Sequence, residues 1–154
     1  MIKNIFLILL LTIAVQLKSQ SLVKKLDFII VVNDGFEPFS SMSLEAIDTN
    51  NFERVITIDY YPGNLEMSWS DFNDLMSPKT KTITLILYST EGKDAKTFQY
   101  QIGIKPKWFE DRYNILKIYN LENKKYRKRL NPLSKDKNYT FELESPSHTF
   151  YRIK

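Results

Sequence analysis

The sequence contains no cysteine, one histidine and only four glycines in 154 residues, and each shortage removes a class of chemistry. Without cysteine there is no disulfide and no thiolate, so a folded domain must rely on its apolar core. The one histidine, His148, has no triad or zinc-pair motif around it. The scattered glycines form no phosphate-binding loop. We therefore expect no cofactor.

Paired carboxylates are the remaining route to hydrolysis, and two pairs stand out, Asp71 with Asp74 and Glu142 with Glu144. The first pair suits the N-terminal end of a helix, and the second suits the solvent side of a strand. Residues 48–53 carry oxygen ligands but lack the central glycine of a calcium loop, so an Asx turn at Asp48 explains them better. The sequence predicts no catalytic residue, no metal ligand and no enzyme.

The N-terminus has the three zones of a secretory signal. Lys3 supplies a positive charge, residues 5–15 are apolar apart from Thr12, and residues 16–20 turn polar. The apolar core is about half of the roughly 20 residues that span a bilayer. We predict a cleaved signal peptide over 1–20 and a single domain over 21–154 with no transmembrane segment. The expected location is the periplasm, with secretion or the cell surface as the alternative.

Period-two alternation of apolar residues dominates the rest of the chain, with turn signals at Asp34-Gly35 and Pro62-Gly63. One short helix is expected near 71–76, with Ser70 as its N-cap. The pattern predicts a mainly β fold, a single antiparallel β-sandwich of immunoglobulin-like or transthyretin-like shape. Its expected strands cover 26–32, 54–61, 65–69, 80–88, 97–104, 113–119, 124–130, 139–143 and 149–153.

Positive charge is concentrated in the C-terminal part of the chain. Residues 21–104 hold 7 Lys/Arg and 12 Asp/Glu, whereas residues 105–154 hold 13 and 6. The densest run consists of Lys124, Lys125, Tyr126, Arg127, Lys128 and Arg129. It fits a face for an anionic partner, but basic residues on a strand also protect a sheet edge from other chains. Nucleic acid is not expected as a partner of an exported protein.

Aromatic residues make up 14% of the chain and suggest an alternative ligand. Trp69, Trp108, Tyr60 and Tyr61 lie near predicted turns, where their rings could stack on sugars. A domain of this size also needs large side chains in its core, so we expect both tryptophans to be buried.

The composition, the Gln20-Ser21 junction and the stretch from Tyr113 to Lys128 resemble small exported β-rich proteins of Bacteroidota-type bacteria. The resemblance implies export and names no activity. Residues 133–154 also resemble the C-terminal sorting domain of the type IX secretion pathway, although Asn138 stands where that pattern favours glycine. The periplasm therefore remains the preferred location.

Two functions from different classes follow. The preferred one is a non-catalytic module that binds a protein partner in the cell envelope, through an exposed sheet edge or through the basic C-terminal hairpin that contains residues 124–129. The alternative is a domain that binds an anionic glycan or small ligand. A hydrolase with paired carboxylates comes third.

Overall fold

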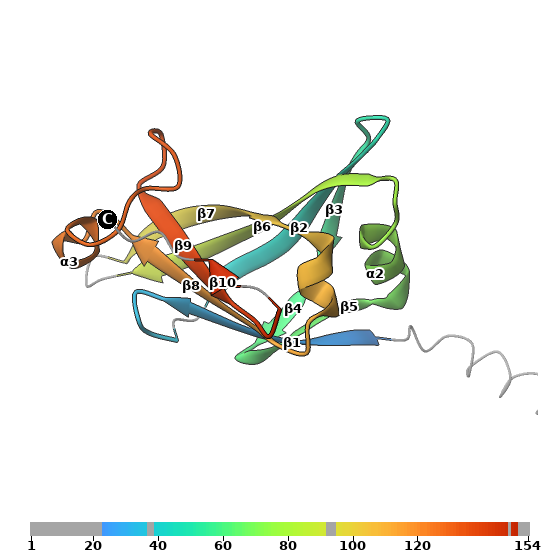
Figure 1. Ribbon diagram of the computed structural model, residues 1–154, viewed down its shortest axis with the longest axis horizontal. Helices are drawn as coiled ribbons and strands as arrows, with labels where there is room; N and C mark the ends of the chain where they lie inside the picture. Colours follow the sequence, from blue (N-terminus) through green and yellow to red (C-terminus); the bar gives the residue numbers. More distant parts are fainter. Residues whose placement is uncertain (1–22, 37–38, 92–94, 148, 151–154) are drawn as a thin grey trace, which may run out of the picture.

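The computed structural model describes residues 23–36, 39–91, 95–147 and 149–150. Over these residues the chain forms two β-sheets with few helices, which confirms the predicted mainly β sandwich (Figure 1). The predicted signal peptide, His148 and the end of the last predicted strand lie outside the described residues. No helix within the described part of the chain is long and apolar enough to cross a membrane.

The larger sheet has six strands in the order β10-β9-β8-β1-β5-β4. These strands are β1 (Val23–Val32), β4 (Asp59–Tyr61), β5 (Gly63–Ser68), β8 (Asn114–Asn120), β9 (Tyr139–Glu144) and β10 (Thr149–Phe150). The pair β1 and β8 is parallel, which differs from the all-antiparallel pattern expected. The chain builds the second sheet between these two strands, a connection long enough to allow parallel pairing.

The smaller sheet has four strands in the order β3-β2-β6-β7. They are β2 (Phe39–Asp48), β3 (Glu53–Thr57), β6 (Thr80–Glu91) and β7 (Lys96–Ile104). Strand β2 has no counterpart among the predicted strands, because Ser40, Ser41 and Ser43 interrupt the alternation of apolar residues in its first half. Its Leu44 and Ala46 nevertheless alternate into the core.

The predicted strand 54–61 divides at Ile58, where the chain changes sheet. Thr57 of β3 pairs with Ser43 of β2, whereas Asp59 of β4 pairs with Glu66 of β5. The two strands therefore close one side of the sandwich, with the Ile58 side chain buried between the sheets. The turn from β4 to β5 falls at the predicted Pro62-Gly63 position.

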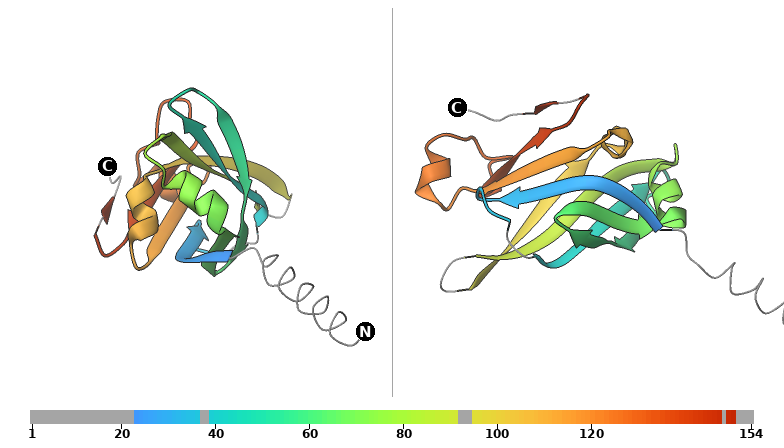
Figure 2. Two further views of the ribbon diagram at one scale, coloured as in Figure 1. Left: turned by 90° about the vertical axis from the view of Figure 1, so that its right-hand side faces the viewer. Right: turned by 90° about the horizontal axis from the view of Figure 1, so that it is seen from below.

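Three short helices complete the described chain: α2 (Trp69–Leu75), η1 (Pro106–Glu110) and α3 (Lys124–Arg127). The predicted helix near 71–76 is confirmed as α2, but its N-cap is Ser68 and not Ser70, since the Ser68 hydroxyl accepts a hydrogen bond from the Asp71 amide at 3.0 Å. Helices α2 and α3 lie at opposite ends of the molecule (Figures 1 and 2).

The core lies between the inward faces of the two sheets. Alternate residues of each strand point into it, as the period-two pattern predicts. Its fully buried members include Phe28 and Ile30 of β1, Leu85 and Leu87 of β6, and Leu116 and Ile118 of β8.

Candidate functional site

The basic segment, which we define as residues 124–130, begins with the helix α3 and continues as a turn in which the Leu130 amide donates to the Tyr126 carbonyl at 2.9 Å. The predicted strand over 124–130 is therefore wrong. Asn123 caps α3 by accepting a hydrogen bond from the Lys125 amide at 2.9 Å. Tyr126 and Leu130, four positions apart, are both buried, and this is a helical spacing. Because the segment is not a strand, its cations do not protect a sheet edge.

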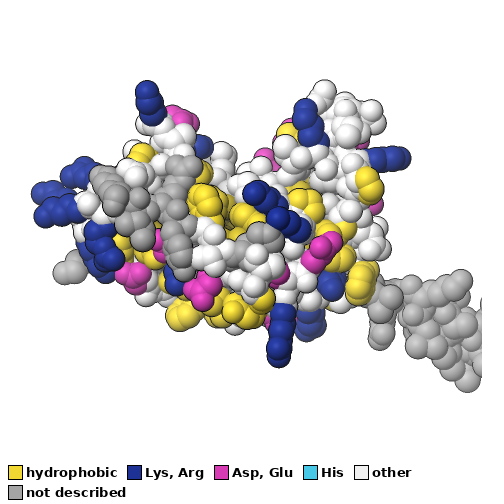
Figure 3. All heavy atoms as spheres, viewed as in Figure 1, with side chains coloured by type: hydrophobic (Ala, Val, Ile, Leu, Met, Phe, Trp, Pro, Cys, Tyr) yellow, Lys and Arg dark blue, Asp and Glu magenta, His cyan; other side chains and the backbone are white. Residues whose placement is uncertain are grey.

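A small apolar cluster holds α3 on the end of β8. It consists of Tyr119, Leu121, Tyr126 and Leu130, separate from the main core. The Tyr119 and Tyr126 rings contact each other with centroids 5.1 Å apart and planes tilted by 43°. The Lys and Arg side chains of the basic segment lie outside this cluster and are exposed. Figure 3 shows Lys and Arg gathered at this end of the molecule.

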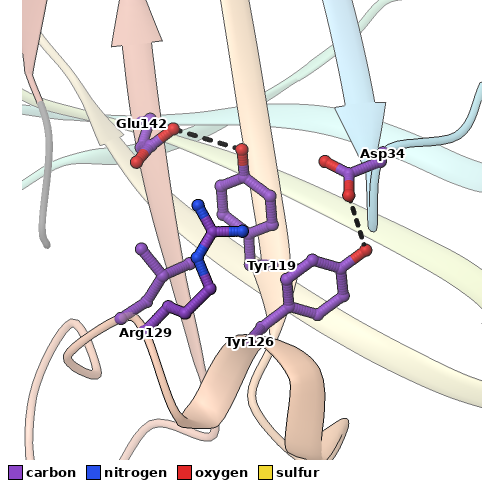
Figure 4. A pocket seen from close by; sticks show the side chains of 6 residues that line it. Asp34, Tyr119, Tyr126, Arg129 and Glu142 are labelled. Atoms are coloured by element: carbon purple, nitrogen blue, oxygen red, sulfur yellow. Dashed lines mark hydrogen bonds between the residues drawn. The ribbon is translucent and has the colours of Figure 1, made fainter.

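A cleft of about 170 Å³ opens beside this cluster, and we call it the tyrosine cleft. It is lined by Asp34, Tyr119, Tyr126, Arg129, Leu130 and Glu142 (Figure 4). Asp34 belongs to the turn after β1, Tyr119 to β8, Glu142 to β9, and the others to the basic segment. Four separate parts of the chain therefore build one site.

The predicted turn at Asn33-Asp34-Gly35 places the first carboxylate. Asn33 and Asp34 have φ values of +52° and +65°, a conformation that Asn and Asp tolerate better than most residues. The Asn33 side chain accepts a hydrogen bond from the Asn120 amide at 2.9 Å, which joins the turn to the end of β8. Asp34 is thereby held opposite α3.

Each tyrosine hydroxyl of the cleft donates to one carboxylate. Tyr119 donates to Glu142 at 3.1 Å, and Tyr126 donates to Asp34 at 3.0 Å. Figure 4 shows the two rings side by side between these carboxylates. The Lys125 ammonium also donates to Asp34 at 2.8 Å and lies 4.8 Å from the centroid of the Tyr126 ring. The polar lining is thus fixed before any ligand enters.

The pKa values of Asp34, Lys125, Tyr119 and Tyr126 are shifted further from 7 than the ordinary values of these residue types. The hydrogen bond from Lys125 lowers the pKa of Asp34, and the same contact raises the pKa of Lys125. Burial is the main cause that raises the pKa of Tyr119, with the Glu142 charge as the next cause. Burial, and then the hydrogen bond to Asp34, raises the pKa of Tyr126. Near pH 7 the carboxylate of Asp34 is ionised and both tyrosines keep their protons.

NMR titration of the Asp34 carboxyl tests its pairing with Lys125. We expect a pKa below the ordinary aspartate value, because the ammonium favours the ionised form. A lowered pKa stabilises the fold above the unfolded-state pKa, and that contribution is lost as pH falls through the folded-state pKa. Lys125→Met should return the pKa toward its ordinary value, whereas Lys124→Met should leave it unchanged. An Asp34 pKa that ignores Lys125→Met would contradict the pair.

A second hollow, of about 310 Å³, lies between α3 and the loop before β9, and we call it the basic groove. Its lining includes three cations, Arg127, Lys135 and Lys137. Among the described residues that line it, Glu122 is the one acid, and its carboxylate is paired with the Lys96 ammonium at 2.6 Å. Leu121, Leu130 and Pro132 supply apolar surface. Leu130 lines both hollows, so the basic groove and the tyrosine cleft flank the same segment.

The four aromatic residues of the stacking alternative do not form one site. Trp108 is buried, as expected, and packs against Phe141. Trp69 is 39% exposed, so its predicted burial is wrong, and the Lys24 ammonium lies 4.9 Å from its ring centroid. The Tyr60 hydroxyl accepts a hydrogen bond from the Ile30 amide at 2.7 Å, while Tyr61 is exposed.

The carboxylates considered for catalysis or metal binding have structural contacts. Arg54 pairs with both Asp71 and Asp74 and ties α2 to β3. Glu144 lies 3.4 Å from the Lys117 ammonium. Asp48 forms the expected Asx turn, since its carboxylate accepts from the amides of Asn50 and Phe52, both at 2.8 Å. Among the described residues, no group of three or more His, Cys, Asp or Glu could hold a metal ion.

Comparison with protein-family models, curated proteins and solved structures gave no match. The site is therefore interpreted from its own geometry. That geometry includes Asp34 and Tyr119, which the sequence did not mark as site residues, and Glu142, which was considered only as a hydrolytic carboxylate paired with Glu144. No local motif marks them, because only the register of β8 with β1 and β9 brings them together.

Proposed function

We propose that this protein is a non-catalytic interaction module of the cell envelope, and that its basic groove binds an acidic segment of a partner protein. The observation that carries the proposal is the local excess of charge. Residues 121–138 contain seven Lys/Arg and only two Asp/Glu. Helix α3 and the following loop place three of these cations around one hollow.

The groove has the chemistry that an acidic peptide needs. Arg127, Lys135 and Lys137 place positive charge around the groove, and this charge attracts the carboxylates of an acidic segment. The apolar surface of Leu121, Leu130 and Pro132 can cover the aliphatic parts of a partner. A groove with both kinds of surface can hold a peptide and also attract it.

Protonation states in the neighbouring tyrosine cleft favour binding over catalysis. A general acid or base works best with a pKa near the operating pH. The shifts described above move Asp34, Tyr119 and Tyr126 away from that range. The groups can hold a ligand in place, but they are not suited to exchanging protons with it near pH 7.

Strand addition at the β7 edge is the less favoured mode. The Tyr139 hydroxyl accepts a hydrogen bond from the Gln101 amide at 2.9 Å and donates to the Gln101 carbonyl at 2.8 Å. These are backbone groups that an incoming strand would need. Strand addition at β7 would therefore have to displace the Tyr139 hydroxyl from Gln101.

The cell envelope is the proposed location because the sequence predicts an export signal over 1–20. The periplasm is preferred, with secretion or the cell surface as the alternative. An acidic region of an envelope protein is the partner chemistry that matches the groove.

Affinity capture tests the proposal. The tagged chain without residues 1–20 would be incubated with envelope extract from its own cell at low and high salt. We expect an acidic protein that is retained at low salt and released at high salt, because exposed charges are screened. The double change Arg127→Glu with Lys135→Glu should reduce its binding by about tenfold or more, which is about 1.4 kcal/mol.

The matched control is Lys105→Glu with Lys107→Glu, an equal number of charge reversals at η1. Figure 1 places η1 toward α2, away from α3. The control should bind the partner as the unchanged chain does. Equal losses in both variants would indicate a general charge effect, and undiminished binding by the Arg127 and Lys135 variant would remove the groove as the contact.

A further inference from the structure

We propose that the tyrosine cleft is a binding site for one neutral sugar ring. This site is separate from the proposed peptide contact, since it lies on the other side of the basic segment and uses Asp34, Tyr119 and Glu142. It also differs from the tryptophan-based glycan site expected from the sequence, whose residues are dispersed. The inference does not depend on the proposed function.

The mixed charge of the cleft selects for hydroxyl groups. An anionic ligand would face Asp34 and Glu142, and a cationic ligand would face Arg129. A sugar hydroxyl avoids both conflicts because it donates and accepts hydrogen bonds. It can donate to a carboxylate of the cleft while it accepts from the Arg129 guanidinium. Hydrogen bonds to a carboxylate or from a guanidinium are stronger than hydrogen bonds between two neutral groups.

The carboxylates keep the capacity to bind a ligand. A carboxylate offers about four lone-pair positions. Asp34 receives hydrogen bonds from Lys125 and Tyr126, and Glu142 receives one from Tyr119. These contacts orient the two groups and leave acceptor positions for sugar hydroxyls. An orientation fixed in advance lowers the entropy lost on binding.

The walls and the volume of the cleft also fit a single sugar ring. The rings of Tyr119 and Tyr126 and the side chain of Leu130 give apolar surface for the C–H face of a sugar. The cavity volume of about 170 Å³ is below the roughly 300–1,000 Å³ of pockets for drug-sized ligands. A longer glycan would place only one unit inside.

NMR chemical-shift titration with methyl glycosides tests the site. The panel would include methyl glucoside, galactoside, mannoside and N-acetylglucosaminide, with glucuronic acid and glucosamine as charged analogues, each up to about 10 mM, a range suited to weak binding. We expect one neutral glycoside to shift the resonances of Tyr119, Tyr126 and Arg129 with a millimolar or lower Kd. Glucuronic acid and glucosamine, the two charged compounds of the panel, should bind more weakly than that glycoside.

Glu142→Gln should weaken sugar binding by about fivefold or more, about 1 kcal/mol, because an amide replaces a charged acceptor. Glu144→Gln, the same change on the same strand, is the matched control and should leave binding unchanged. A chain-end oligosaccharide that binds more tightly than the free glycoside would identify a glycan as the source, and equal affinity would identify the free sugar. Absence of binding across the panel, preference for glucuronic acid, or equal effects of the two variants would overturn the proposal.

Discussion

Replacement of Phe28 by alanine is expected to lower the free energy of unfolding by about 3–5 kcal/mol. Phe28 is 1% exposed, and it stands where β1 passes from one neighbour to the other, paired with Gly63 of β5 and with Asn114 of β8. Loss of its ring opens a cavity at the junction of three strands. Domains are commonly stable by only about 5–15 kcal/mol, so this change removes a large part of the total.

Urea denaturation followed by circular dichroism measures the effect on the chain without residues 1–20. The matched control is Phe52→Ala, since the Phe52 side chain is 68% exposed. The control should change the free energy of unfolding by less than about 0.5–1 kcal/mol. Comparable losses in the two variants would contradict the placement of Phe28 in the core.

The sheets were largely predictable from the sequence because burial of one face imposes a period of two. Strands β6, β7 and β9 alternate clearly, and the structure confirms them. Strand β2 was not predicted, because its serines on the exposed side and near its start weaken the apolar signal. The parallel pair of β1 and β8 was also unexpected, since strand patterns carry no information on which distant strands become neighbours.

The basic segment shows where local pattern was misleading. Its run of cations was interpreted as a strand that protects a sheet edge, but the buried residues Tyr126 and Leu130 follow a helical spacing. The tyrosine cleft was beyond prediction for a different reason. Asp34 looked like a turn residue and Glu142 like a solvent-facing strand residue, and both interpretations are locally correct. Only the tertiary arrangement gives them a shared cleft.

Tyr139→Phe is expected to lower the free energy of unfolding by about 1–3 kcal/mol and to promote self-association. The Tyr139 ring packs edge-on against Tyr100 with centroids 5.1 Å apart, and phenylalanine preserves this contact. The substitution removes only the hydroxyl that satisfies the Gln101 amide and carbonyl. Partly buried polar groups without partners are costly, and an edge strand with free backbone groups can pair with another chain.

Urea denaturation and light scattering over a range of protein concentrations separate the two effects, and Tyr113→Phe is the matched control because Tyr113 is 39% exposed. The control should leave both measurements unchanged. For Tyr139→Phe, scattering should rise with concentration while the circular dichroism spectrum still shows a β fold. A monomeric Tyr139→Phe chain of unchanged stability would mean that the hydroxyl does not protect the β7 edge. Self-association caused by loss of one oxygen atom would instead show that this edge is suited to strand addition and is closed by Tyr139.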